Sequence, residues 1–130
     1  MFFSSDAIKI YFCSRPTDMR MSFNGLYGTA KSFMGHDPMS GALFVFRNQR
    51  GNRLKILLWD RNGFVIWYKL LPKGTFRFPS TISGNSIDVD YGTLMMILEG
   101  IDLKTARRQK RFQYRKTPPK LTPTLTPEPS

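Results

Sequence analysis

The residue types that most often do chemistry are sparse in this 130-residue chain, and their spacing does not assemble a catalytic set. His36 is the only histidine and Cys13 the only cysteine, too few for a structural zinc site. His36 lies in a Gly-His-Asp-Pro segment typical of a loop, and Cys13 ends an apolar run typical of a buried strand. We expect neither to be catalytic, and a cysteine without a partner fits a reducing compartment.

Acidic side chains are the second route to chemistry, because nucleases and transposases hold divalent metal ions with carboxylates. Most of these residues have a local explanation: Asp18 and Asp90 can cap helices, Asp60 falls in a turn and Asp88 in a short edge strand. A nuclease built from Asp18, Asp60 and Glu99 stays open as a third possibility, provided that the fold brings them together. No glycine-rich phosphate loop followed by Lys and Ser or Thr is present. The sequence therefore predicts no enzyme, no metal and no cofactor.

Positive charge is the strongest chemical feature. The chain has 20 Lys and Arg against nine Asp and Glu, a net charge of +11. Residues 1–103 hold twelve basic and eight acidic groups, a net of +4, whereas residues 104–130 hold eight and one, a net of +7. This asymmetry predicts a polyanionic partner. The basic run includes Phe112 and Tyr114, which can stack on bases, but it lacks the apolar face that a membrane surface requires. We expect nucleic acid, and no membrane, as the partner.

Two basic groups are the predicted phosphate contacts, because Lys and Arg that neutralise phosphates release counterions. The first flanks a hairpin, and the second begins the C-terminal tail, whose alternative role is only to keep the chain soluble. A third, weaker group brackets the first predicted helix. In order, the groups are Arg47, Arg50, Arg53, Lys55 and Arg61; Lys104, Arg107, Arg108, Lys110, Arg111, Arg115 and Lys116; and Arg15 and Arg20.

A second function remains open beside DNA binding. Trp59, Trp67 and Tyr68 are large side chains in the strand-rich middle of the chain. If they form one exposed apolar patch, the protein is an adaptor that docks a protein partner, and its DNA contact is incidental.

The elements that must position these residues are a sheet and two helices. Apolar runs separated by short polar breaks predict an antiparallel meander, and Asn62-Gly63 suits a type I′ hairpin turn. Imperfect alternation indicates that part of the second face is also buried, or contacts a partner. The four runs are Ala42–Arg47, Arg53–Trp59, Phe64–Leu71 and Thr75–Phe78, with further short strands predicted at 8–13 and 87–89.

Helical spacing of apolar residues predicts one long helix over Asp18–Met34, and a short helix between a cap at Asp90 and a stop at Gly100. The predicted fold is α+β: an antiparallel meander of four to five strands packed against these helices, with a disordered basic, proline-rich tail. Residues 5–103 form the domain and 104–130 the tail. No signal peptide or membrane-spanning run is recognisable, so we expect a cytoplasmic protein.

Several ordered blocks also resemble a known family. They are Pro16-Thr17-Asp18-Met19-Arg20, Asp37-Pro38-Met39-Ser40-Gly41, Trp67-Tyr68-Lys69-Leu70 and Leu98-Glu99-Gly100-Ile101-Asp102. From about Ile8 to Leu103 the chain closely resembles the small TnpB accessory proteins of IS-66-type insertion sequences, which are unrelated to the RNA-guided nuclease of the same name. Two departures are Met21, where a basic residue is common, and the Thr-Pro tail.

The resemblance implies a non-catalytic accessory role in bacterial DNA transposition and recombination. Its implied partners are the DNA ends of the mobile element and a separate, larger transposase that holds the catalytic metal site. The family supplies no catalytic residues to place on this sequence. The oligomeric state and the DNA site stay open.

Overall fold

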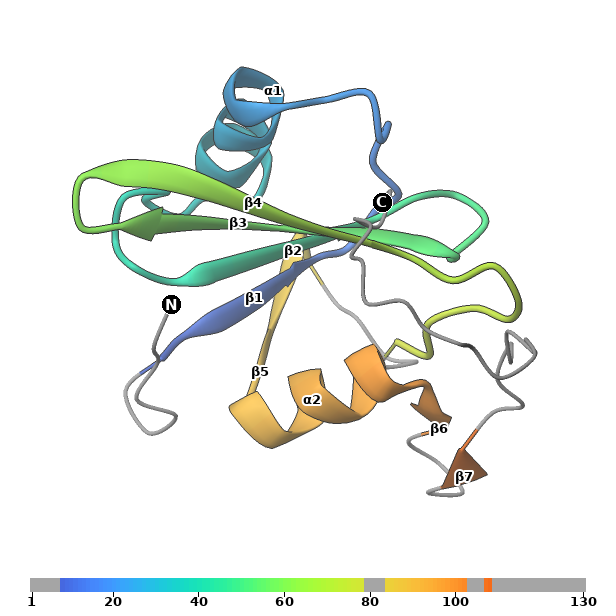
Figure 1. The fold of residues 1–130 in the computed structure, drawn as a ribbon. Helices are drawn as coiled ribbons and strands as arrows, with labels where there is room; N and C mark the ends of the chain where they lie inside the picture. Colours follow the sequence, from blue (N-terminus) through green and yellow to red (C-terminus); the bar gives the residue numbers. More distant parts are fainter. Residues whose placement is uncertain (1–7, 79–83, 103–106, 109–130) are drawn as a thin grey trace, which may run out of the picture.

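The computed structural model describes residues 8–78, 84–102 and 107–108, and it shows a five-stranded sheet with a helix on each face (Figure 1). The strand order is β4-β3-β2-β1-β5. The strands are β1 (Ile10–Cys13), β2 (Leu43–Arg47), β3 (Arg53–Asp60), β4 (Gly63–Leu70) and β5 (Ser86–Val89). The helices are α1 (Phe23–Gly28), its π-helical continuation η1 (Thr29–Phe33) and α2 (Tyr91–Glu99); β6 (Ile101–Asp102) pairs with β7 (Arg107–Arg108).

The predicted meander is right for three strands and wrong for the rest of the sheet. β2, β3 and β4 are consecutive and antiparallel, as expected from their short connections. β1, however, runs parallel to β2, because α1 and η1 cross over between them and return the chain to the same end of the sheet. The sheet is therefore mixed. β5, predicted as a short strand, pairs antiparallel with β1 and forms the far edge.

Thr75–Phe78 is not a strand, contrary to the prediction. The backbone N–H of Leu71 bonds to the Asn52 carbonyl at 2.8 Å, and that of Phe76 bonds to the Gly51 carbonyl at 2.8 Å. These bonds hold the segment after β4 against the β2–β3 connection, so the segment does not run alongside β4 as a further strand. Phe76 is 3% exposed, so its apolar character reflects burial in the core.

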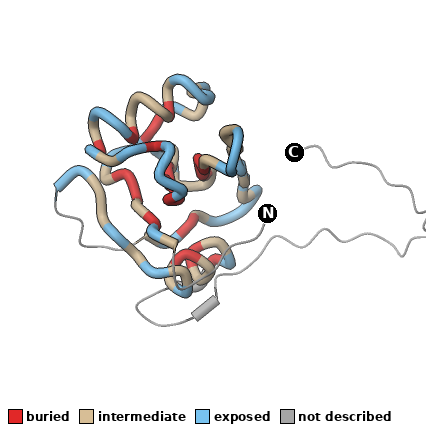
Figure 2. The backbone as a smooth tube through the Cα atoms, turned by 90° about the vertical axis from the view of Figure 1, so that its left-hand side faces the viewer, coloured by how far each residue is buried: buried red, intermediate tan, exposed pale blue. Residues whose placement is uncertain are grey.

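Each face of the sheet carries a cluster of buried side chains, which explains the imperfect alternation in the sequence. Figure 2 shows how buried, intermediate and exposed residues follow one another along the chain. On one face, Phe44, Phe46 and Leu57 pack against Leu26 of α1 and Ala30 of η1. On the other, strand residues including Ile56 and Leu58 pack with Leu94 and Ile97 of α2. A strand covered on both sides needs apolar side chains at odd and even positions alike.

The first helix is shorter than predicted and begins at Phe23. Asp18 does not cap it. Its carboxylate instead accepts the backbone N–H of Arg20 at 2.9 Å. The helix then widens into η1, where the N–H of Met34 reaches the carbonyl of Thr29. An apolar stripe could locate the buried face but could not reveal this change of hydrogen-bond pattern.

The second helix follows the prediction at both ends. The Asp90 carboxylate accepts the Thr93 N–H at 2.7 Å, and this bond lowers the pKa of Asp90. Gly100 ends the helix with φ +77°. The β3–β4 turn begins one residue earlier than predicted, since Asp60 and Gly63 pair across it. Arg61, with φ +59°, takes the left-handed position in this turn. No helix in the described ranges is long and apolar enough to cross a membrane.

Candidate nucleic-acid interface

A shallow basic groove of about 520 Å³ lies where the segment before α1 meets the β2–β3 connection. The backbone N–H of Thr17 bonds to the Arg47 carbonyl at 2.7 Å and holds the two segments together. The structure therefore gathers Arg50 and Arg53 of the hairpin group with Arg20 of the weaker third group. The lining residues are Thr17, Asp18, Met19, Arg20, Asn48, Gln49, Arg50, Arg53 and Tyr68.

An aromatic side chain forms part of this groove. Tyr68 is 46% exposed, and its hydroxyl accepts a hydrogen bond from Nη1 of Arg53 at 2.7 Å. The bond fixes a guanidinium beside an accessible ring. Cationic and aromatic groups in this arrangement suit a phosphate backbone and a neighbouring base.

Lys55 serves the groove indirectly. Its side chain is 7% exposed, and its Nζ donates to the carbonyls of Met19 at 2.9 Å and Met21 at 2.7 Å. Nζ also lies 4.7 Å from the centre of the Tyr68 ring. Lys55 was predicted to contact phosphate, but its ammonium is committed to backbone oxygens. It positions the segment that contains Arg20.

The charge of the groove is partly cancelled by Asp18. The Arg20 guanidinium donates to both Asp18 carboxylate oxygens, with Nη2 2.7 Å from Oδ2. These bonds lower the pKa of Asp18 to about 2 and raise that of Arg20. Asp18 is thus ionised at any physiological pH. Three arginines and one aspartate leave the groove a net charge of +2.

The other predicted phosphate contacts lie elsewhere. Arg47 is in register with Leu54, so it faces the α2 side of the sheet, with its guanidinium 5.4 Å from the Phe78 ring centre. Arg61 is in the β3–β4 turn, at the far end of β3 from the groove. Seven residue steps along β3 place the start of this turn about 23 Å from Arg53. Arg107 and Arg108 form β7, and Lys104, Lys110, Arg111, Arg115 and Lys116 lie outside the described residues.

The three predicted patch residues do not form one surface. Trp67 pairs with Ile56 and faces α2, whereas Tyr68 pairs with Lys55 and faces the α1 side. Trp59 shares the face of Tyr68, but it lies toward the other end of the strand and packs edge-on against Phe64, with ring centres 4.9 Å apart. Trp67 and Tyr68 lie on opposite faces because neighbouring strand residues alternate between the two faces of a sheet.

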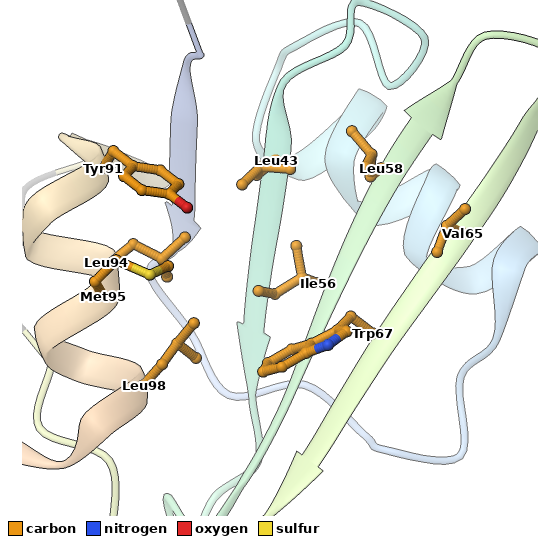
Figure 3. Close-up of a pocket in the computed structure, with 9 residues that line it drawn as sticks. All are labelled: Leu43, Ile56, Leu58, Val65, Trp67, Tyr91, Leu94, Met95 and Leu98. Atoms are coloured by element: carbon orange, nitrogen blue, oxygen red, sulfur yellow. The ribbon is translucent and has the colours of Figure 1, made fainter. Parts of the chain in front are cut away.

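Trp67 instead borders an apolar pocket of about 180 Å³ between the sheet and α2 (Figure 3). The side chains of Tyr91, Met95 and Leu98 approach from the helix, and those of Leu43 and Ile56 from the sheet. The pocket offers no polar side-chain set for chemistry.

The carboxylates proposed for a nuclease are scattered. Asp18 lies in the groove, Asp60 ends β3 and Glu99 ends α2. Within residues 8–78 and 84–102, no three His, Cys, Asp or Glu side chains are grouped so that they could hold a metal ion. The nuclease that required their convergence is therefore not supported.

Sequence reasoning missed the contribution of Tyr68, Asn48 and Gln49 to the groove. A signal was available for Tyr68. Pairing β3 with β4 through a two-residue turn after Asp60 places Tyr68 opposite Lys55, on the face that also bears Arg53. The approach of Arg20 had no local signal, because Arg20 and Arg50 are thirty residues apart.

One comparison with known proteins identifies a family. The family model described as IS66 Orf2 like protein matches residues 8–108. Two uncharacterized proteins of Sinorhizobium fredii (strain NBRC 101917 / NGR234) are similar to this chain. One, y4jC, is 30% identical over 105 residues, which cover 81% of this chain and 89% of the relative. The other, y4hO, is 32% identical over 99 residues, which cover 76% and 85%. No solved structure gives a significant match.

The family match covers all of the described residues, including the five strands of the sheet and both walls of the groove. The resemblance found in the sequence blocks is thereby confirmed: the chain belongs to the IS66 Orf2-like family.

Proposed function

We propose that this protein is a non-catalytic accessory factor of insertion-sequence transposition that binds DNA at the element ends through the basic groove. Membership of the family supports the link to transposition. The observation that carries DNA binding is the convergence of Arg20, Arg50 and Arg53 beside the exposed Tyr68 ring. The groove is shallow and open, so its arginines are suited to phosphates more than to base edges. The basic tail adds salt-sensitive affinity.

The test is fluorescence-anisotropy binding of the full chain to labelled element-end and scrambled duplexes over a salt series. The double variant Arg50→Ala/Arg53→Ala removes two phosphate contacts, so affinity at low salt should fall about tenfold, and the slope of log K against log salt should flatten by roughly 1.8. Lys31→Ala/Lys73→Ala removes the same charge from exposed positions outside the groove and is the matched control.

Equal losses in the two double variants would show that only net charge matters and would contradict the groove. A clear preference of the full chain for element ends supports recognition of those ends by the accessory factor. Indifference to duplex sequence would refute recognition of the ends by this protein alone, even if the groove effect were present.

Removing the counter-charge within the groove should strengthen binding. In Asp18→Asn the guanidinium of Arg20 loses its ionic partner and becomes available to phosphate, so affinity should rise about threefold at low salt. Because the pKa of Asp18 is depressed to about 2, its contribution to folding is present above the unfolded pKa and lost only as the pH falls toward 2. Wild-type affinity between pH 5 and 8, measured by the same anisotropy assay, should show no titration of Asp18. A weaker Asp18→Asn variant would contradict this account.

The adaptor function keeps one supporting observation, which is the 40% exposure of Trp67 beside the apolar pocket. As an adaptor, the protein would bind the transposase equally well with and without Arg50 and Arg53. Co-precipitation of purified transposase by the Arg50→Ala/Arg53→Ala variant separates the two functions.

A further inference from the structure

The outer edge of β4 is open and unusually apolar. β4 ends the sheet order, so no described strand pairs with its outer side. Three large apolar side chains near its end are well exposed: Trp67 at 40%, Tyr68 at 46% and Leu70 at 44%. Lys69 is the only charged residue among its eight. A long edge strand with one charge and no proline is a template for pairing with another strand.

We propose that a second copy of this chain pairs with the outer edge of β4, antiparallel, about a two-fold axis that is normal to the sheet and lies midway between Ile66 and its copy. The two five-stranded sheets then form one continuous sheet of ten strands. The argument for this interface does not require DNA binding, although Tyr68 belongs both to the basic groove and to the shared edge.

The side chains of β4 complement one another in this register. An axis normal to the sheet maps each face onto itself, so opposite residues must both be odd or both be even. With Ile66 opposite its own copy, Val65 lies opposite the partner's Trp67 and Phe64 opposite the partner's Tyr68. Each pair occurs twice. Aromatic rings then meet an aliphatic side chain on the α2 face and another ring on the α1 face, and both are favourable cross-strand pairs.

Charge complementarity fixes the same register. Lys69 lies opposite the partner's Gly63, which has no side chain to block it. The next residue across the partner's sheet is Asp60, which is in register with Gly63 and shares the face of Lys69. The backbones of Lys69 and the partner's Asp60 are then about 9.6 Å apart, two strand spacings, which their side chains can span.

Both partners of this ion pair are available. Asp60 is exposed and makes no ion pair with any described residue. Lys69 donates to the Leu98 carbonyl at 2.9 Å, a partly exposed bond that a rotated side chain can give up. Moving the axis to Trp67 would place Lys69 opposite Val65 and lose the pair, so the axis at Ile66 is preferred.

Sedimentation velocity of the full chain over a concentration series tests the interface. We expect a reversible dimer that Trp67→Lys weakens at least tenfold, because each copy loses an aromatic contact and gains a charge at the shared edge. Met39→Lys is the matched control, since Met39 is 46% exposed but lies off the sheet, and it should leave the dimer unchanged. A monomer at every concentration, or a dimer that Trp67→Lys leaves intact, would overturn the proposal.

A charge exchange tests the register. Asp60→Lys alone and Lys69→Asp alone each place like charges together, and each should weaken the dimer several-fold. The double variant restores an attractive pair with opposite polarity and should recover wild-type affinity to within about threefold. Thermal melts identify any variant that has lost its fold. A folded double variant as weak as the single variants would refute this register.

Discussion

Replacing Lys55 by Met should lower the free energy of unfolding by about 3 kcal/mol, because it removes charged hydrogen bonds from two carbonyls at a buried site. Methionine keeps the apolar stem and much of the volume, so packing against Tyr68 is largely preserved. What is lost is the donor to Met19 and Met21. Those carbonyls belong to the segment that holds Arg20 against the hairpin, so the variant should also bind DNA more weakly while still folded.

Urea denaturation followed by tryptophan fluorescence measures the loss. Lys69→Met is the matched control. It makes the same substitution on the neighbouring strand, but it removes a single hydrogen bond, to Leu98, from a less buried side chain. Its cost should stay near 1 kcal/mol. Equal costs for the two variants would mean that the two carbonyls near Lys55 are readily satisfied by water.

Elements set by local signals followed the sequence closely. Asp90 and Gly100 bound α2 because a side-chain cap and a left-handed glycine act within a few residues of themselves. β3 and β4 are adjacent because a two-residue turn leaves no other pairing. The double-sided burial of β3 was visible in its apolar residues, although which helix covers which face was not.

Elements set by distant contacts could not be predicted in the same way. The direction of β1 depends on how α1 and η1 return the chain to β2. The segment before α1 is hydrogen-bonded to Lys55, which is 34 to 36 residues away in the sequence from the carbonyls that it holds. The sequence pattern indicated a capping residue at Asp18 and an apolar stripe after it. It did not indicate that the buried Lys55 ammonium donates hydrogen bonds to the carbonyls of Met19 and Met21.

The candidate site shows the same division. The basic character of the hairpin was evident, and Arg50 and Arg53 do line the groove. Charge alone did not separate a buried Lys55 from its exposed neighbours, because burial is decided by what packs over a strand. Applying strand alternation to the aromatic residues would have placed Trp67 and Tyr68 on opposite faces.

Leu94→Ala should cost about 3 kcal/mol of unfolding free energy, because it removes a fully buried side chain from the contact between α2 and the sheet. Leu94 is 1% exposed, and alanine leaves a void that the surrounding strands can fill only in part. Met95 is its natural comparison. It is the next residue of the same helix and lines the open apolar pocket, where truncation leaves space that solvent can reach (Figure 3).

Met95→Ala should therefore cost about 1 kcal/mol, and both variants should unfold in one transition by urea denaturation. The contrast tests whether α2 belongs to the cooperative core of the domain. If Leu94→Ala costs no more than Met95→Ala, α2 is held only loosely against the sheet. That result would contradict the close packing of Leu94 and Ile97 against the sheet. It would mean that α2 gives little cover to the sheet face that bears Trp67.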